Sequence, residues 1–247
     1  TFYSLEMILA IGFRVRSKRG TQFRQWANQN LASYMVKGFV MDDERLKNPD
    51  GRPDYFDELL ARIRDVRASE KRFYQKVRDL FALSSDYDGS DKATQMFYAE
   101  TQNKILFAIT GKTAAEIIYE RADKSKEFMG LTTWKNAPKG KILKSDITIA
   151  KNYLNENEIG DLNLLVSAFL DLAEFQARRN QIMTMKDWLE RTNKFLESNS
   201  LDVLPNAGKV SHEQAIEKAN QEFEKFRIIQ DKNYISDLDE TIKKLKK

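Results

Sequence analysis

Hydrophobic and polar residues alternate with the period of an α-helix along almost the whole chain, and no stretch shows the two-residue alternation of a β-strand. The clearest case is residues 158–179, where apolar side chains recur every three or four positions, and we expect this segment to be the central core helix. Only 10 glycines and 4 prolines interrupt 247 residues, so helix breakers are few. The pattern predicts an all-α fold.

A second strong pattern predicts one long helix from Asp54 to about Leu83. Its apolar residues follow alternating steps of four and three, as in a heptad seam, with Glu70 as the polar exception: Leu59, Ile63, Val66, Phe73, Val77 and Leu80. Because such a seam pairs two helices, it predicts a homo-oligomer formed through the 54–83 helix.

Two shorter helices are expected before it, residues 4–12 ending at Gly12 and a second from Thr21 to about Val36. The second helix is expected to bury Phe23, Trp26, Leu31 and Tyr34. The polar segment 42–53, with two prolines and a glycine, is the best domain boundary.

Helix start signals organise the rest of the chain. Thr113 with Glu116, and Ser211 with Gln214, have capping-box spacing, and Ser145 is expected to begin a helix to about Leu154. A last segment repeats apolar residues at 3-4-3 spacing: Ile235, Leu238, Ile242 and Leu245. We expect four parts: 1–41, the C-terminal part of a basic module; 42–85, a connector and long helix; 86–210, a helical domain; and 211–247, C-terminal helices.

The charge distribution adds a functional hypothesis. The net charge of +4 conceals two basic islands. Residues 1–37 carry six Lys and Arg against Glu6, and residues 124–144 carry six Lys against Glu127, a net +5 in each. Basic islands in an otherwise acidic chain favour a surface for a polyanion such as DNA, provided that folding brings them together.

The candidate nucleic-acid-binding residues come from these islands: Arg14, Arg16, Lys18, Arg19, Arg24, Lys135, Lys139 and Lys141. Solvated charge around a helix, and a loop whose lysines serve solubility, are the alternative interpretations. Phe23 and Trp26, three residues apart on a helix, are interpreted as core residues rather than as base-stacking ones.

Several classes of active site are excluded. The chain has no cysteine and one histidine, which rules out disulfides, thiol nucleophiles and Cys/His zinc sites. A catalytic triad would need His212, at a helix start where we expect solvent exposure. Gly-Lys-Thr at 111–113 has Leu106 where a phosphate-binding loop needs glycine. No metal or cofactor is expected, and no run of about 18 apolar residues exists to span a membrane.

Carboxylates are the remaining catalytic option. Glu116 and Glu120 lie one helical turn apart and are weak candidates for cation binding or acid–base work. Glu116 is also explained as the acid of the capping box. Asp171 and Glu174, close to Arg178, indicate a polar stripe or a buried ion network on the core helix.

Sequence motifs across the chain resemble the RhuM-type virulence protein family of bacteria. They are R-S-K-R-G-T-Q-F-R-Q-W-A, Y-F-D-E-L-L-A-R-I-R-D-V-R-A-S-E-K-R-F-Y-Q-K, T-A-A-E-I-I-Y-E-R-A-D, M-G-L-T-T-W-K, D-I-T-I-A-K-N-Y-L and M-T-M-K-D-W. The resemblance extends to about Phe226. Family members normally begin some tens of residues earlier with a segment resembling a DNA-binding helical module, so it implies a chain that is N-terminally truncated at Thr1. It implies a genomic association with pathogenicity islands and no known reaction.

These observations favour a cytoplasmic, nucleic-acid-associated, non-enzymatic protein of a virulence or mobile-element family. Two alternatives stay open. One is a toxin-like or effector enzyme with an acidic site in the 86–210 domain, and the other is an oligomeric interaction scaffold.

Overall fold

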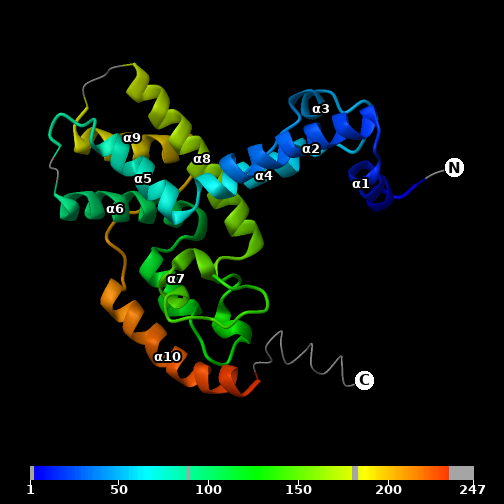
Figure 1. Ribbon diagram of the computed structural model, residues 1–247. Coiled ribbons are helices and arrows are strands. Elements are labelled where there is room, and N and C mark those ends of the chain that lie inside the picture. Colours follow the sequence, from blue (N-terminus) through cyan, green and yellow to red (C-terminus); the bar gives the residue numbers. More distant parts are fainter. Residues whose placement is uncertain (1–2, 88–89, 180–182, 234–247) are drawn as a thin grey trace. The chain divides into compact units, whose positions relative to one another are not determined.

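The computed structural model describes residues 3–87, 90–179 and 183–233, and all regular secondary structure in these ranges is helical (Figure 1). The predicted all-α class is therefore confirmed. The expected last apolar segment, residues 235–245, lies outside the described residues. Contacts divide the chain into two compact units, Thr1–Leu60 (the N-terminal unit) and Ala61–Lys247 (the C-terminal unit). Each unit is described by itself.

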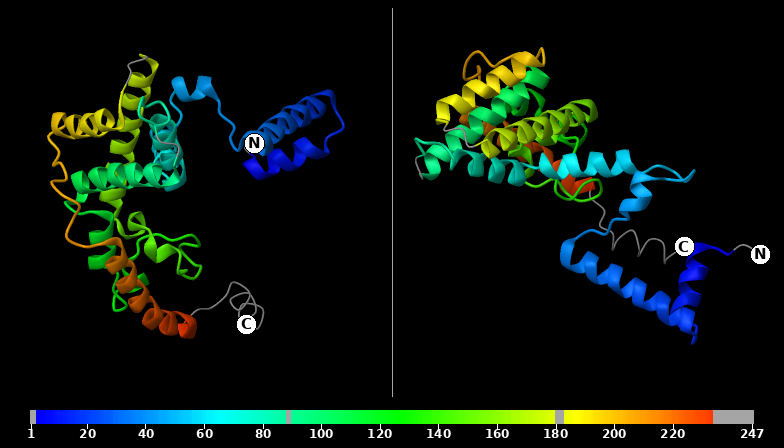
Figure 2. Two further views of the ribbon diagram at one scale, coloured as in Figure 1. Left: turned by 90° about the vertical axis from the view of Figure 1, so that its left-hand side faces the viewer. Right: turned by 90° about the horizontal axis from the view of Figure 1, so that it is seen from above.

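The N-terminal unit is built on a helical hairpin of α1 (Leu5–Arg14) and α2 (Lys18–Lys37), visible in both views of Figure 2. A short helix, α3 (Asp43–Lys47), follows within the segment expected to be a connector. Next comes α4 (Phe56–Arg67), which continues into the other unit.

The prediction that the first helix ends at Gly12 is wrong, because α1 continues to Arg14. A Cβ atom on Gly12 would lie 2.6 Å from the ring of Phe23 on α2. The glycine is therefore needed where the two helices approach each other, and it does not stop the helix.

The prediction that α2 buries its apolar residues is also wrong. Trp26, Leu31 and Tyr34 are each more than half exposed, and Phe23 is half-buried. The ring of Phe23 contacts those of Phe13 and Trp26, with centroids 5.5 and 5.9 Å apart. Among the described residues of this unit only Gly20 is fully buried, because two short helices cannot enclose a core between them.

The single helix expected over 54–83 is interrupted. α4 ends at Arg67 and α5 spans Glu70–Phe81. Between them Ser69 has an extended backbone (φ −62°, ψ 140°), and its hydroxyl donates to the carbonyl of Val66 at 2.7 Å. That bond satisfies one of the free carbonyls at the end of α4.

The heptad seam is split by this break. In α5, Phe73 and Val77 are buried in the core of the C-terminal unit, whereas Ile63 and Val66 of α4 stay exposed. The two halves of the pattern therefore face different surroundings and form no continuous seam.

The core of the C-terminal unit lies between α5, α6 (Asp91–Thr110), α8 (Glu156–Arg178) and α9 (Met185–Ser198). Phe169 of α8 joins them, with ring centroids 6.3 Å from Phe73 and 6.2 Å from Phe195. α8 corresponds to the expected core helix, and this prediction is confirmed. No helix in the described ranges is both long and apolar enough to cross a lipid bilayer.

A second layer of the same unit packs α7 (Ala114–Arg121) against α10 (His212–Asn233). A 3-10 turn, η1 (Glu127–Gly130), follows α7 within residues 124–144, the Lys-rich loop. The helix expected from Ser145 consists instead of two 3-10 turns, η2 (Asp146–Thr148) and η3 (Ala150–Tyr153). The Ser145 side chain forms no cap hydrogen bond, and the neighbouring carboxylate of Asp146 accepts N–H groups from the loop before it.

Gly130 and Gly160 provide a matched test of this packing. Gly130 has φ +82° and a Cβ there would lie 2.3 Å from the Arg121 carbonyl oxygen, so Gly130→Ala is expected to lower the free energy of unfolding by about 2 kcal/mol or more. Gly160, inside α8, has open space around it, so Gly160→Ala is expected to raise it by about 0.5–1 kcal/mol. Urea unfolding measures both, and equal effects would contradict the close approach at Gly130.

Candidate functional site

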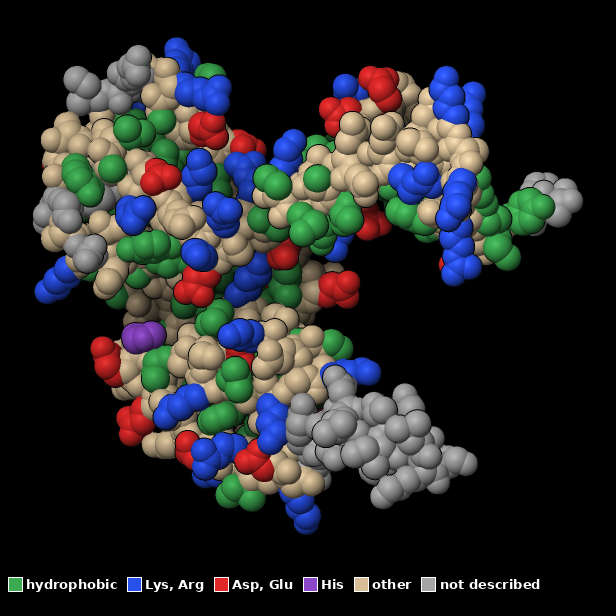
Figure 3. Space-filling model, viewed as in Figure 1, with side chains coloured by type: hydrophobic (Ala, Val, Ile, Leu, Met, Phe, Trp, Pro, Cys, Tyr) green, Lys and Arg blue, Asp and Glu red, His purple; other side chains and the backbone are tan. Residues whose placement is uncertain are grey.

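Four predicted DNA-contacting residues gather at the turn between α1 and α2. Arg14 ends α1, Arg16 lies in the connection, and Lys18 and Arg19 begin α2. All four side chains are exposed, and none pairs with a carboxylate in the part of the chain that the structure describes. Figure 3 shows Lys and Arg side chains in a column over this end of the N-terminal unit. We name these four residues the basic turn.

Arg24, the fifth predicted residue of this island, has a structural contact instead. Its guanidinium donates to the carbonyl of Val15 at 2.9 Å and to that of Gly12 at 3.4 Å. These are carbonyls at the end of α1 that have no partner within the helix. Arg24 therefore holds the hairpin together. Gly20 allows this close start of α2, since a Cβ there would lie 2.5 Å from the Val15 oxygen.

The first turn of α2 has an unusual charge. Helix N-termini carry partial positive charge and favour acidic side chains, yet this turn contains Lys18 and Arg19 and no acid. Ser17 accepts the N–H of Gly20 and so caps one free donor. Within α1 and α2 the only acidic residue is Glu6, so these two helices carry a net positive charge around the basic turn.

The Lys-rich loop of the C-terminal unit is ordered by its own polar contacts. The buried carboxylate of Asp146 accepts the N–H groups of Lys135 at 3.2 Å and Leu143 at 2.7 Å. The indole of Trp134 donates to the Gly140 carbonyl at 2.7 Å. The loop is closed around these groups, and its charged side chains point outward.

The three predicted lysines of the loop differ in their contacts. Lys135 and Lys139 are exposed, while Lys141 pairs with Asp231 of α10 at 2.7 Å. That contact lowers the pKa of Asp231. Lys135 and Lys139 thus remain candidates for phosphate contact, and Lys141 attaches the loop to α10. The two basic islands belong to different units, so each is described by itself.

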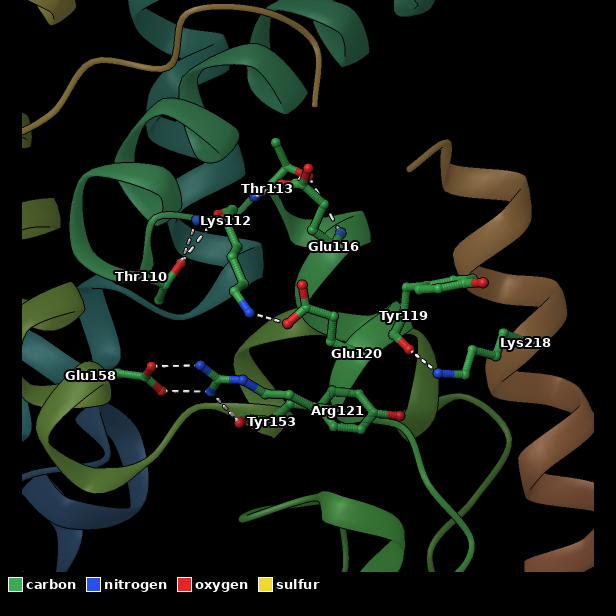
Figure 4. A network of polar contacts seen from close by, with 10 residues as sticks. All are labelled: Thr110, Lys112, Thr113, Glu116, Tyr119, Glu120, Arg121, Tyr153, Glu158 and Lys218. Atoms are coloured by element: carbon green, nitrogen blue, oxygen red, sulfur yellow. Dashed lines mark hydrogen bonds and ion pairs between the residues drawn. The ribbon is translucent and has the colours of Figure 1, made fainter. Parts of the chain in front are cut away.

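Glu116 and Glu120, the weak catalytic candidates, both have partners (Figure 4). Glu116 accepts the N–H of Thr113 at 2.8 Å, completing the capping box, and the N–H of Lys209, also at 2.8 Å. Partial burial raises the pKa of Glu116, but these hydrogen bonds outweigh it and lower the pKa overall. Glu120 pairs with Lys112.

Glu116 does not have the chemistry of a general acid. A carboxylate with a lowered pKa holds no proton near neutral pH. Among the described residues no three His, Asp or Glu side chains gather as a metal site would require. His212 is exposed at the start of α10, as expected.

An ion pair that the sequence analysis missed lies next to them. Arg121 donates to both oxygens of Glu158 at 2.6 Å and to the Tyr153 carbonyl at 2.8 Å. The Arg121 hydrogen bond is the main cause that lowers the pKa of Glu158. Glu158 also forms a capping box with Asn155 at the start of α8. The three-residue spacing of these two residues is a sequence signal for that capping role.

The pairs expected on the core helix are exposed. Asp171 pairs with Arg67, and Glu174 with Arg178, each at 2.7 Å. Both carboxylates are more than half exposed, so they form a polar stripe and not a buried network.

A family model described as Virulence protein RhuM family matches residues 1–235. This chain belongs to that family. Comparison with curated proteins and with solved structures gives no significant match. Membership in the RhuM family therefore assigns no role to individual residues of this chain.

The Arg121–Glu158 pair yields a pH-dependent prediction. Its side chains are largely shielded, so Arg121→Met is expected to lower the free energy of unfolding by about 2 kcal/mol at neutral pH. Since the pair lowers the pKa of Glu158 in the folded state, its contribution is complete above the unfolded pKa, about 4.3, and is lost as the pH falls through the folded value. The deficit of the variant should therefore shrink below about pH 4.

Urea unfolding at a series of pH values measures this effect. Lys186→Met, which breaks an exposed pair with Glu190, is the control and should change stability by less than about 0.5 kcal/mol. A deficit in Arg121→Met that stays constant down to pH 3 would contradict the assigned role.

Proposed function

We propose that this RhuM-family protein associates with nucleic acid through the basic turn and does so without catalysing a reaction. The supporting observation is that Arg14, Arg16, Lys18 and Arg19 are exposed within one short stretch and form no ion pair with a described carboxylate. Among the described residues, Arg19 donates a hydrogen bond only to the neutral amide of Gln22. Arg and Lys at such a surface contact phosphate oxygens, which gives affinity and register without reading base edges.

An aromatic side chain next to the basic turn extends the proposal. Arg19, Phe23 and Trp26 are spaced four and three residues apart, so they lie along one face of α2. Trp26 is 60% exposed instead of buried, which leaves its ring available. Arg with an exposed aromatic ring is the usual combination for single-stranded nucleic acid, where bases stack on the ring.

The proposal predicts a change in salt dependence. Replacing Arg14, Arg16, Lys18 and Arg19 by alanine should weaken binding and reduce the slope of log K against log salt by up to about 3–4, because each phosphate contact adds about 0.7–0.9. Fluorescence anisotropy with labelled duplex and single-stranded DNA, between about 50 and 200 mM salt, measures the slope.

The matched control removes the same charge elsewhere, from four exposed lysines: Lys186, Lys194, Lys225 and Lys232. It should leave the slope nearly unchanged. Equal losses in the two variants would show that net charge alone causes the binding, and absence of binding at low salt would contradict the proposal itself. The exposed Lys135 and Lys139 form a separate variant, because they belong to the other unit.

An interaction scaffold is a second candidate function, favoured by the apolar surface of the N-terminal unit. Met35 and Val36, at the end of α2, are 78% and 85% exposed, and apolar side chains also cover α1. Several large apolar side chains exposed on one small unit are typical of a binding surface for a protein. The seam at 59–80 is a poor alternative, because α5 buries its half within its own unit.

The scaffold role predicts self-association through α2. Light scattering of the intact chain should show a dimer or larger species, and Met35→Glu with Val36→Glu should shift it towards the monomer by placing charges in the interface. Ile228→Glu, at an exposed apolar site on α10, is the control. A monomer at high concentration would remove self-association as the role of this surface.

The enzyme alternative has less support. Glu116 stabilises the start of α7 and Glu120 pairs with Lys112, so neither carboxylate is free to act on a substrate.

A further inference from the structure

A groove of about 560 Å³ lies between α5 and α8 in the C-terminal unit. Its walls are the end of α4, one side of α5 with the residues that follow it, and one side of α8. On α5 the lining residues Arg72, Lys76 and Leu80 are four positions apart, so they form one stripe along the helix. The volume falls within the range of small-molecule sites.

The groove has two distinct ends, because α5 and α8 run in the same direction. The rings of Phe73 and Phe169 have centroids 6.3 Å apart near the start of α5. Beyond the end of α5, the N–H of Ser85 donates to the carbonyl of Met183 at 2.9 Å. One end of the groove is therefore the α4–α5 junction, and the far end lies beyond Leu80.

The far end of the groove is apolar. Leu80 and Ala177 are half-buried there, and Leu83, which follows α5, is 60% exposed. Leu170 of α8 adds a buried apolar surface to the lining. Apolar side chains that stay partly open to water gain free energy when an apolar ligand covers them.

The junction end of the groove is cationic. Arg67 ends α4, and Arg72 and Lys76 lie one turn apart on α5. Arg67 pairs with Asp171 at 2.7 Å. Arg72 and Lys76 are exposed, and neither forms an ion pair with a carboxylate among the residues that the structure describes. These two cations can therefore contact an anion without first breaking an ion pair in the described chain.

The two carboxylates of the lining lie farther along the groove. Glu174 pairs with Arg178 at 2.7 Å, so together they add no net charge. Asp79 comes three residues after Lys76 on α5. The groove is thus positive at the junction end and not at the far end. A ligand with one anionic end and an apolar body matches this polarity, and a cationic ligand does not.

We propose that this groove binds a free, single-chain anionic amphiphile with its charged head at Arg72 and Lys76. The chain of the ligand covers Leu80, Leu83 and Ala177. Arg72 and Leu80 are about 12 Å apart along α5, so an extended alkyl chain is needed to connect the two ends. Fatty carboxylates and alkyl phosphates share this chemistry. The site lies outside the basic turn and does not depend on the proposed function.

The experiment uses the intact chain and probes that share one alkyl chain: decanoate, decyl phosphate, decanol and decyltrimethylammonium. Binding is followed by NMR shifts, with each probe below its micelle concentration and its solubility. The two anions should bind more tightly than decanol, and decyltrimethylammonium should bind most weakly, because the cations at the junction end repel it. The ratio of the two anion affinities identifies the preferred head. Equal affinity for decanoate and decyltrimethylammonium would overturn the proposal.

Charge variants test the head contact. Replacing Arg72 and Lys76 together by glutamine should weaken decanoate and decyl phosphate about three- to tenfold, because two partly exposed ion pairs are lost, and should leave decanol unchanged. The control replaces Lys225 and Lys232, two exposed lysines of α10, by glutamine and should change no affinity. Equal losses in the two double variants would overturn the assigned site.

Chain length and groove shape test the apolar contact. Decanoate should bind about three- to tenfold more tightly than octanoate, because each buried methylene contributes up to about fourfold. Ala177→Phe should fill the groove and weaken every probe. Leu83→Ser, at a more exposed site, should weaken decanoate about two- to threefold while Tm stays unchanged. An affinity that ignores chain length, or that Leu83→Ser leaves unchanged, would contradict the chain contact.

Vesicles separate a free amphiphile from a membrane surface. Binding of monomeric decanoate or decyl phosphate that depends on Arg72 and Lys76 supports the proposal. Sedimentation with phosphatidylglycerol vesicles that depends on these residues, without binding of either monomeric probe, would overturn it in favour of a lipid surface. Absence of binding to probes and vesicles alike would overturn it as well.

Discussion

Burial of one face of α5 is the constraint on which much of the C-terminal unit depends. Phe73 and Val77 are almost completely enclosed, and Phe73 contacts the rings of Tyr98 and Phe169 from two other helices. To reach this position the chain must leave the line of α4, which it does at Ser69. The break also splits the heptad pattern, because only its second half enters the core of the C-terminal unit.

The sequence predicts which segments form helices, but it does not predict what covers the apolar face of each helix. Apolar spacing located α8, and the Thr113–Glu116 pair located the start of α7, because both signals act within one or two turns. The heptad spacing at 59–80 is compatible equally with a partner chain and with the protein's own core, since either one covers the same stripe. Spacing also could not show that Trp26 stays exposed, because that depends on what lies opposite it.

The charged residues show a similar limit. Arg24 and Arg19 lie five positions apart in one basic island, yet Arg24 binds carbonyls of α1 and Arg19 lacks any acidic partner in the described chain. Lys141 and Lys139 differ in the same way. Sequence identified the islands, but only the positions of backbone oxygens and carboxylates decide which cations are free. The candidate phosphate-contacting surface therefore contains fewer residues than the two basic islands of the sequence.

The cations in the first turn of α2 couple helix stability to the ionic surroundings. Lys18 and Arg19 repel the positive end of their own helix, so the folded hairpin is less stable than the same hairpin with a neutral first turn. A polyanion at this turn relieves the repulsion, and because it favours the folded form it also shifts the folding equilibrium by mass action. For any polyanion that binds this turn, occupancy of the surface and order in the hairpin would be two measures of one linked equilibrium.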